Sequence, residues 1–266
     1  MQTYYYVHTG HRIGLDRFRR AAAIIKELGD FDITMLCSDF RIAQIADEYG
    51  VKNSVGVDVV RNIPQISHHG DRIIFDSDEA NPIMLEDMKN YFSTFVHISN
   101  ETVAVDRDFF NADEEKSIKI TYFFGDDDYE KDLEKNLSFI EGLDAHLQLG
   151  FYYFLDYEVM LKEKFSTFSE FEEYAQTIKK TDILITSSPQ AVLESLASKG
   201  RPVYVKRADY SDDYDKLFEN LNIPIIKDYN KNKLISILKR IDEQNYNDIE
   251  QLSNKTNQMI KDNFNL

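Results

Sequence analysis

The amino-acid sequence predicts an α/β protein with two Rossmann-like domains whose parallel sheets face each other across a cleft. Short apolar segments with strand character alternate with segments that have the apolar period of a helix. The alternation occurs in two successive trains, with a break in the pattern between them. The chain has 266 residues, and at roughly 150 residues per domain this length fits about two domains.

The first train covers residues 1–108 and begins with a β-prone aromatic run at residues 4–8. Residues 15–28 follow with apolar side chains at helical spacing, and Gly29 closes that helix. Further strands are expected at 33–37, 55–60, 72–75 and 95–98, and further helices at 42–49 and 84–92. This order of short apolar strands and helices favours a parallel sheet with helices on both faces.

The second train covers residues 118–245, after a stretch without periodicity at 109–117 that we interpret as a linker. Strands are expected at 118–124, 146–153, 182–186, 202–205 and 224–226, and helices at 130–143, 156–165, 170–179, 191–198, 212–221 and 233–241. The remaining segment, residues 246–266, carries apolar residues on one helical face. We expect it to form a C-terminal helix that packs back on the N-terminal domain.

The composition is acidic, with 47 Asp and Glu against 31 Lys and Arg and a formal net charge of -16. Nucleic-acid binding needs a positive surface, so this balance argues against a nucleic-acid partner. No apolar run is long enough to span a bilayer, and the first residues lack the pattern of a signal peptide. With a single cysteine, Cys37, these features predict a cytoplasmic protein without an intramolecular disulfide.

The loop after the first strand is the first candidate site, because parallel sheets bind ligands at the carboxyl ends of their strands. Gly14 allows close approach of the backbone, and the helix N-terminus that follows favours an anion. Arg17 and Arg20 lie three residues apart and are predicted to hold an anionic group, although solvated helix residues would give the same pattern. His8 and His11 are candidate catalytic bases, and two histidines alone do not make a metal site.

Two further loops carry carboxylates after strands. Asp76 follows the fourth strand and is a candidate catalytic residue, unless it caps the next turn. Gly125 can approach a diphosphate, but residues 126–128 are all aspartates. Two like charges 4 Å apart repel by about 4 kcal/mol at an effective dielectric near 20. We therefore expect one aspartate to cap the next helix, and the loop to meet a diphosphate only through Mg²⁺, the one cofactor considered.

The most informative segment is residues 181–203, where a strand ends in small hydroxyl residues and a helix begins. Ser187 and Ser188 can cap that helix or donate to a ligand. Gln190 lies in the first turn of the helix and Glu194 further along it, where a carboxylate can accept ribose or sugar hydroxyls. These four residues are predicted to bind a ligand.

This segment resembles the nucleotide-binding strand-helix-strand motif of the GT-B superfamily. The residues that match the motif are Glu194, Gly200, Pro202 and Val203, with one extra residue between Glu194 and Gly200. The N-terminal loop resembles the GT-B-like nucleotide-sugar hydrolases of pseudaminic acid synthesis. Their pattern is Gly-x-Gly-His-x-x-Arg, with the histidine implicated in catalysis. Gly14 and Arg20 match this pattern, whereas Asp16 replaces the second glycine and Arg17 replaces the histidine.

The resemblance implies a GT-B-like fold and an enzyme that acts on a nucleotide-activated sugar in surface-carbohydrate biosynthesis, as a glycosyltransferase or a relative of the hydrolases. Arginine stays protonated at neutral pH, so the base would have to be another group, such as His8 or His11. Two alternatives stay open. One is a catalytically inactive binding or scaffolding protein with a protein partner, and the other is a sugar-nucleotide epimerase.

Overall fold

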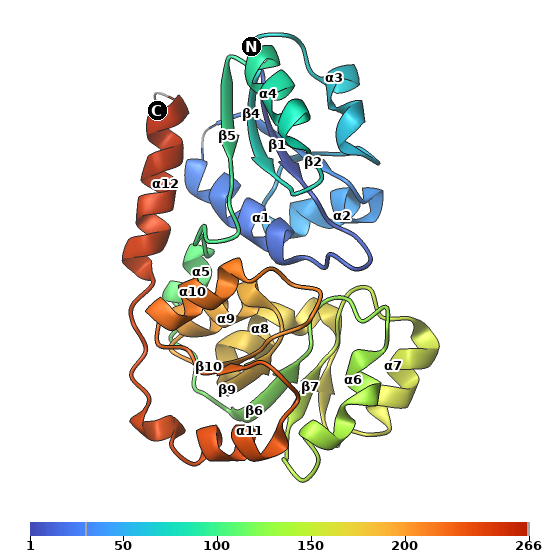
Figure 1. Ribbon diagram of the computed structural model, residues 1–266, viewed down its shortest axis with the longest axis vertical. Coiled ribbons are helices and arrows are strands. Elements are labelled where there is room, and N and C mark those ends of the chain that lie inside the picture. Colours follow the sequence, from blue (N-terminus) through green and yellow to red (C-terminus); the bar gives the residue numbers. More distant parts are fainter. Residues whose placement is uncertain (30, 265–266) are drawn as a thin grey trace. The chain divides into compact units, whose positions relative to one another are not determined.

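The computed structural model describes residues 1–29 and 31–264, which divide into two compact units (Figure 1). Unit 1 comprises Met1–Arg107 and Gln251–Leu266, and unit 2 comprises Asp108–Glu250. A short helix, α5 (Arg107–Phe110), lies where the chain passes from unit 1 to unit 2. Within the described residues, no helix has the length and apolar character needed to cross a membrane.

Unit 1 contains a five-stranded parallel sheet in the order β3-β2-β1-β4-β5. Its central strand is buried along its whole length, because helices cover both faces. The strands are β1 (Thr3–Val7), β2 (Ile33–Cys37), β3 (Asn53–Gly56), β4 (Arg72–Asp76) and β5 (Thr94–His97). The connecting helices are α1 (Asp16–Leu28), α2 (Phe40–Ile45), the 3₁₀ helices η1 (Ala46–Tyr49) and η2 (Val60–Asn62), α3 (Ile63–Ile66) and α4 (Pro82–Tyr91).

Unit 2 contains a six-stranded parallel sheet in the order β11-β10-β9-β6-β7-β8. The strands are β6 (Ile118–Phe123), β7 (His146–Gln148), β8 (Phe168–Ser169), β9 (Thr181–Thr186), β10 (Arg201–Val205) and β11 (Ile225–Ile226). The helices are α6 (Asp132–Lys135), η3 (Leu137–Phe139), α7 (Leu155–Lys162), η4 (Phe171–Glu173), α8 (Tyr174–Lys180), α9 (Pro189–Ala197), α10 (Asp213–Asn220), α11 (Lys231–Leu238) and η5 (Ile241–Glu243). The prediction of two Rossmann-like halves with parallel sheets is confirmed.

The last helix, α12 (Glu250–Phe264), packs on unit 1 although the chain reaches it from unit 2. Its buried side includes Ile260 and Phe264. The hydroxyl of Ser253 accepts a hydrogen bond from the Val105 amide at 3.2 Å, and Arg72 donates to the Phe264 carbonyl at 3.4 Å. Figure 1 shows this helix in red beside α1 and β5.

Several predicted elements differ from those in the structure. The helix expected at residues 130–143 is only α6 and η3, because the Asn136 side chain bonds back to the Asp132 carbonyl at 2.7 Å and closes the helix early. The strand expected at 146–153 ends at Gln148. Gly150 then packs on the loop after β6, where a Cβ would lie 2.4 Å from the Gly125 carbonyl oxygen. The two-residue strand β8 was not predicted.

Candidate functional site

The predicted site residues follow the central strands of the two sheets. In unit 1 the strand order reverses between β1 and β4, and in unit 2 it reverses between β6 and β9. Open parallel sheets bind ligands outside the carboxyl ends of their strands at such a reversal. His8 follows β1, Asp76 ends β4, Gly125 lies just after β6, and Ser187 follows β9.

In unit 1, Asp76 and Arg20 form a buried ion pair at the end of β4. The Arg20 Nε and Nη2 donate to the two Asp76 carboxylate oxygens at 3.0 and 2.6 Å, and the Tyr5 hydroxyl donates to the same carboxylate at 3.1 Å. Arg20 Nη1 also donates to the carbonyls of Ser99 and Thr102, at 3.2 and 3.4 Å. A buried, bonded pair is costly to separate, so these contacts tie both residues to the loop after β5, and their predicted roles in catalysis and anion binding stay predictions.

His8, Arg17 and Asp78 form a second cluster that is more accessible to solvent. The Nδ1 of His8 lies 3.4 Å from the Asp78 Oδ1, and Arg17 Nη1 donates to the same oxygen at 3.0 Å. The His8 side chain is 19% exposed and that of Asp78 is 66% exposed. Arg17 Nε lies 3.8 Å from Asp76 and joins this cluster to the buried pair.

The Asp78 carboxylate favours one tautomer of the histidine. Bonds from His8 and Arg17 hold the pKa of the Asp78 carboxyl well below its usual range, so it is ionised at neutral pH. An ionised acceptor favours the tautomer in which the His8 Nδ1 carries the proton, and this leaves Nε2 as the basic nitrogen. The arrangement can therefore remove a proton from a bound hydroxyl or water.

The other residues of the N-terminal loop form a tight turn. The Gly10 carbonyl accepts hydrogen bonds from the amides of Ile13 and Gly14, at 3.0 and 2.9 Å, and Gly14 has a left-handed φ of 73°. The Ser38 hydroxyl accepts from the Thr9 amide and donates to the Thr9 carbonyl, both at 2.8 Å, so the loop is anchored on β2. His11 lies in the exposed part of this turn, so the structure brings His8 into the carboxylate cluster and leaves His11 in the turn.

In unit 2, the acidic loop after β6 is occupied by contacts within the unit. Asp127 accepts hydrogen bonds from Arg207 at 3.1 and 3.3 Å, and Asp209 accepts from the same guanidinium at 2.7 and 3.0 Å. Asp128 accepts from the amides of Asp132 and Leu133, at 2.7 and 3.0 Å, so the predicted capping of the next helix is confirmed. Burial raises the pKa of both Asp127 and Asp128.

These contacts leave no carboxylate set for the Mg²⁺ considered for this loop. Two of its three aspartates are committed to Arg207 and to the start of α6. Across the described part of the chain, no three His, Cys, Asp or Glu side chains are grouped as metal ligands. The donor set of the loop therefore does not fit a divalent cation.

The turn from β9 into α9 places the four remaining predicted residues together. Ser188 caps α9 by accepting a hydrogen bond from the Ala191 amide at 3.1 Å, and Pro189 occupies the first helical position. The Oε1 of Glu194 accepts from Gln190 Nε2 at 3.1 Å, and its Oε2 accepts from the Tyr174 hydroxyl at 2.5 Å. In the turn between α9 and β10, Gly200 packs closely on Ser195, since a Cβ there would lie 2.4 Å from the Ser195 hydroxyl oxygen.

Buried hydroxyl groups lie at the same edge of the second sheet. The Tyr153 hydroxyl has no hydrogen-bond partner among the residues that the structure describes. The Ser187 hydroxyl makes no hydrogen bond of good geometry, although it lies beside Tyr229. Burial raises the pKa of the Tyr229 phenol to about 12, and the nearby Ser187 hydroxyl opposes this rise. Buried polar groups normally have partners, so these hydroxyls are suited to meet a polar ligand.

Tyr174 and Arg207 are among the site residues that were not predicted. The guanidinium of Arg207 also stacks on the rings of Phe124 and Tyr210, at 4.9 and 4.7 Å. Its position two residues after β10 was a usable signal, since that is again a carboxyl end. Tyr174 begins α8 and reaches Glu194 only through packing of α8 against α9, which no local pattern reports.

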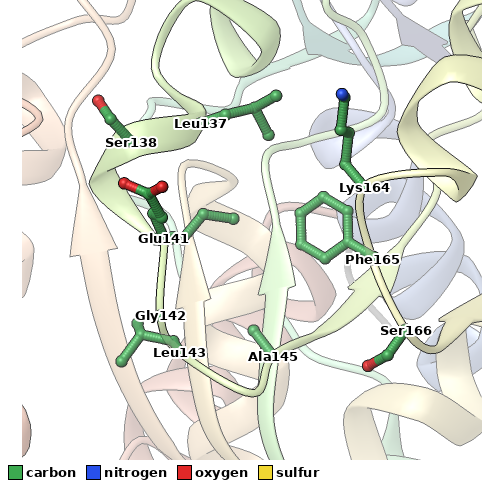
Figure 2. A pocket seen from close by; sticks show the side chains of 10 residues that line it. Leu137, Ser138, Glu141, Gly142, Leu143, Ala145, Lys164, Phe165 and Ser166 are labelled. Carbon is green, nitrogen blue, oxygen red and sulfur yellow. The ribbon is translucent and has the colours of Figure 1, made fainter.

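A pocket of about 490 Å³ lies elsewhere in unit 2 (Figure 2). Its lining includes Leu143 and Ala145, just before β7, and Phe165 and Ser166, just before β8. These residues precede their strands, so the pocket lies at the amino edge of the sheet, opposite the carboxyl edge. It contains none of the predicted site residues.

Comparison with known proteins gives structural matches only. No protein-family model and no curated protein matches the sequence. The UDP-GlcNAc 2-epimerase of Methanocaldococcus jannaschii, solved with UDP-GlcNAc and UDP, matches with a TM-score of 0.62 at 12% identity, over 98% of this chain and 99% of its own. The heptosyltransferase WaaC of E. coli, solved with ADP, matches with a TM-score of 0.51 at 8% identity, over 92% of this chain and 99% of its own.

A third match is the spinosyn rhamnosyltransferase SpnG, solved with thymidine diphosphate. Its TM-score is 0.55 at 7% identity, and the match covers 100% of this chain and 96% of that one. At such identities the similarity shows a shared fold. The two Rossmann-like units are thus of the GT-B type, and function has to be argued from the site.

Proposed function

We propose that this chain is a GT-B-like enzyme that acts on a nucleotide-activated sugar, as a glycosyltransferase or a close relative, in surface-carbohydrate biosynthesis. The pathway rests on the resemblance of the N-terminal loop to the hydrolases of pseudaminic acid synthesis. The substrate class is supported by the fold, because structural matches were solved with UDP-GlcNAc, UDP, ADP and thymidine diphosphate.

The observation that carries the proposal is the pairing of His8 with Asp78 beside Arg17 at the strand reversal of unit 1. His8 Nε2 accepts the proton of an acceptor hydroxyl or a water, while Asp78 orients the imidazole. The deprotonated oxygen attacks the anomeric carbon of the sugar. The bond from that carbon to the phosphate oxygen breaks, and the nucleoside diphosphate leaves with the bonding electrons.

The residues of unit 2 supply the nucleotide end of the proposed reaction. The N-terminus of α9 and the hydroxyls of Ser187 and Ser188 hold the diphosphate, since helix N-termini favour anions. Glu194 accepts the ribose hydroxyls, and Arg17 holds an anionic group of the substrate. Both sets of residues have to reach one substrate molecule, so the expected cleft stays a prediction.

The binding half of the proposal is tested by thermal unfolding and calorimetry with UDP, ADP, GDP, thymidine diphosphate and their common sugar conjugates, with and without magnesium. One of these nucleotides is expected to bind without magnesium. At a concentration 100 times its Kd it adds about 2.7 kcal/mol to the free energy of unfolding. No change in melting temperature with any of them at millimolar concentration contradicts the proposal.

A matched pair of variants tests where the nucleotide binds. Ser188→Ala and Asn81→Ala each remove one helix N-cap, in α9 and in α4, and each is expected to cost about 1 kcal/mol of stability. Only Ser188→Ala is expected to weaken nucleotide binding, because Asn81 caps a helix outside the nucleotide site. Equal affinity in the two variants argues against binding at α9.

A catalytically inactive binding protein is the second candidate. It is favoured by the loss of the loop histidine to Arg17 and by the internal hydrogen bonds of the Glu194 carboxylate. This candidate predicts that the nucleotide sugar binds and stays intact. Phosphorus NMR of the bound sugar nucleotide separates the two candidates, since release of the nucleoside diphosphate establishes catalysis.

A further inference from the structure

We infer that the Tyr174 hydroxyl competes with the ribose of a nucleotide for Glu194. This hydroxyl has to leave the Glu194 carboxylate before a nucleotide binds there. The inference rests on the proposed function and concerns its regulation. Glu194 is 2% exposed, and both of its carboxylate oxygens already accept hydrogen bonds, from Gln190 and from Tyr174. The bond from Tyr174 is the shorter of the two, at 2.5 Å against 3.1 Å.

A phenol and a ribose hydroxyl are the same kind of donor for a carboxylate. Because Glu194 is buried and the Tyr174 hydroxyl bonds to its Oε2, a ribose diol reaches that oxygen only when Tyr174 moves aside. A buried hydrogen-bonding group is costly to leave unpaired, so the protein does not give up this contact without cost. Nucleotide binding therefore includes the replacement of one hydroxyl by another.

Tyr174 is held so that its hydroxyl stays close to Glu194. The ring packs against Phe123 with centroids 5.2 Å apart and is almost fully buried. The turn just before Tyr174 is closed by reciprocal capping between Glu170 and Glu173. Glu170 is fixed in turn by an ion pair with Lys162 at 2.6 Å. An anchored donor has a high effective concentration, so it competes well with a free ligand.

The consequence is a protein in which only a fraction of molecules has an open ribose site. The apparent Kd for a nucleotide is the intrinsic Kd divided by that fraction. A ligand that binds the open form pulls the phenol away from Glu194. The closed form keeps the carboxylate satisfied when no nucleotide is present.

The test compares wild type with Tyr174→Phe by calorimetric titration with UDP, ADP, GDP and thymidine diphosphate. Phenylalanine keeps the ring packing on Phe123 and removes only the competing hydroxyl. The affinity for the nucleotide that binds is expected to rise about tenfold, which equals about 1.4 kcal/mol. Tyr246→Phe is the matched control, because its hydroxyl bonds to the Pro202 carbonyl at the amino end of β10, and its affinity is expected to stay at the wild-type value.

A double-mutant cycle with Glu194→Ala makes the result specific. If the phenol competes for this carboxylate, the gain from Tyr174→Phe disappears in the Glu194→Ala background. An unchanged or weaker affinity of Tyr174→Phe in a wild-type protein that binds nucleotide overturns the inference and leaves the proposed function standing. Absence of binding by wild type and by Tyr174→Phe alike overturns both.

Discussion

His8 and His11 are three residues apart in one loop, but the residues around them give them different chemistry. His8 has an ionised carboxylate on its Nδ1, whereas His11 lies in the exposed turn that follows Gly10. A carboxylate partner orients an imidazole and stabilises the cation formed when it takes a proton. The candidate base is therefore His8, and the pair of histidines offers an internal comparison.

We predict that His8→Gln lowers kcat for the sugar nucleotide at least about 100-fold, which is the usual contribution of a general base. Glutamine keeps a polar side chain of similar length, so the affinity for the nucleoside diphosphate should change by less than about twofold. His11→Gln should reduce kcat by less than about threefold. Steady-state kinetics together with calorimetry checks both values, and a larger loss in His11→Gln would assign the base to His11.

At the residue scale, the sequence located part of the candidate site through one rule, that ligand-binding groups follow the strands of a parallel sheet. His8, Asp76, Ser187 and Ser188 came from this rule, and the structure puts them at carboxyl ends. The contact of Tyr174 with Glu194 could not be predicted, because it joins two helices through packing. The same holds for Arg207 and Asp127, which are 80 residues apart in sequence.

The strands and helices show which local signals are reliable. The bounds of β2 were predicted to the residue, because a short apolar run flanked by polar residues has few alternatives. The segment after the acidic loop was predicted as one long helix from its apolar spacing, yet Asn136 closes it after one turn. The spacing of apolar residues cannot report a side chain that bonds back to the carbonyl of an earlier residue.

A half-buried histidine of β7, His146, gives this part of the sheet a pH dependence. His146 bonds through Nδ1 to the Thr167 hydroxyl at 3.0 Å and through Nε2 to the Ser169 hydroxyl at 2.9 Å. Burial lowers its pKa in the folded protein, an effect that Glu173 partly opposes. The folded state thus favours the neutral imidazole.

We predict that this contribution to stability is complete above about pH 6.5, the usual pKa of an unfolded histidine, and is lost as the pH falls below it. The sign follows from the lowered pKa, because the unfolded chain takes up the proton first. Urea unfolding of wild type and His146→Gln between pH 5 and pH 8 measures the effect. The free energy of unfolding of wild type should fall more steeply towards pH 5, and parallel curves would refute the assignment.

The molecule as a whole consists of two units with separate hydrophobic cores, and unit 1 is built from two separate segments of the chain. The amphipathic spacing of the last segment predicted a helix, and α12 has its buried side chains on one face. It adds Ile260, which is fully buried, and Phe264 to unit 1. The stability of this unit therefore depends on residues at both ends of the sequence.

We predict that Ile260→Ala costs about 2–5 kcal/mol of the stability of unit 1, the usual loss for a large buried aliphatic side chain. Leu252→Ala on the same helix is the control, since Leu252 is 38% exposed and should cost less than about 1 kcal/mol. Hydrogen exchange resolved by residue separates the units. Faster exchange in β1 and β4 with no change in β6 and β9 is expected, whereas equal acceleration in both sheets would argue against the division.

The return of α12 to unit 1 also sets the order in which a newly made chain can mature. All of unit 2 is translated before the helix that completes unit 1. During that interval the first sheet lacks Ile260 and Phe264, while unit 2 already has every residue that it needs. A chain that stops just before Ile260 would hence contain all of unit 2, and the unit that was made first would be the incomplete one.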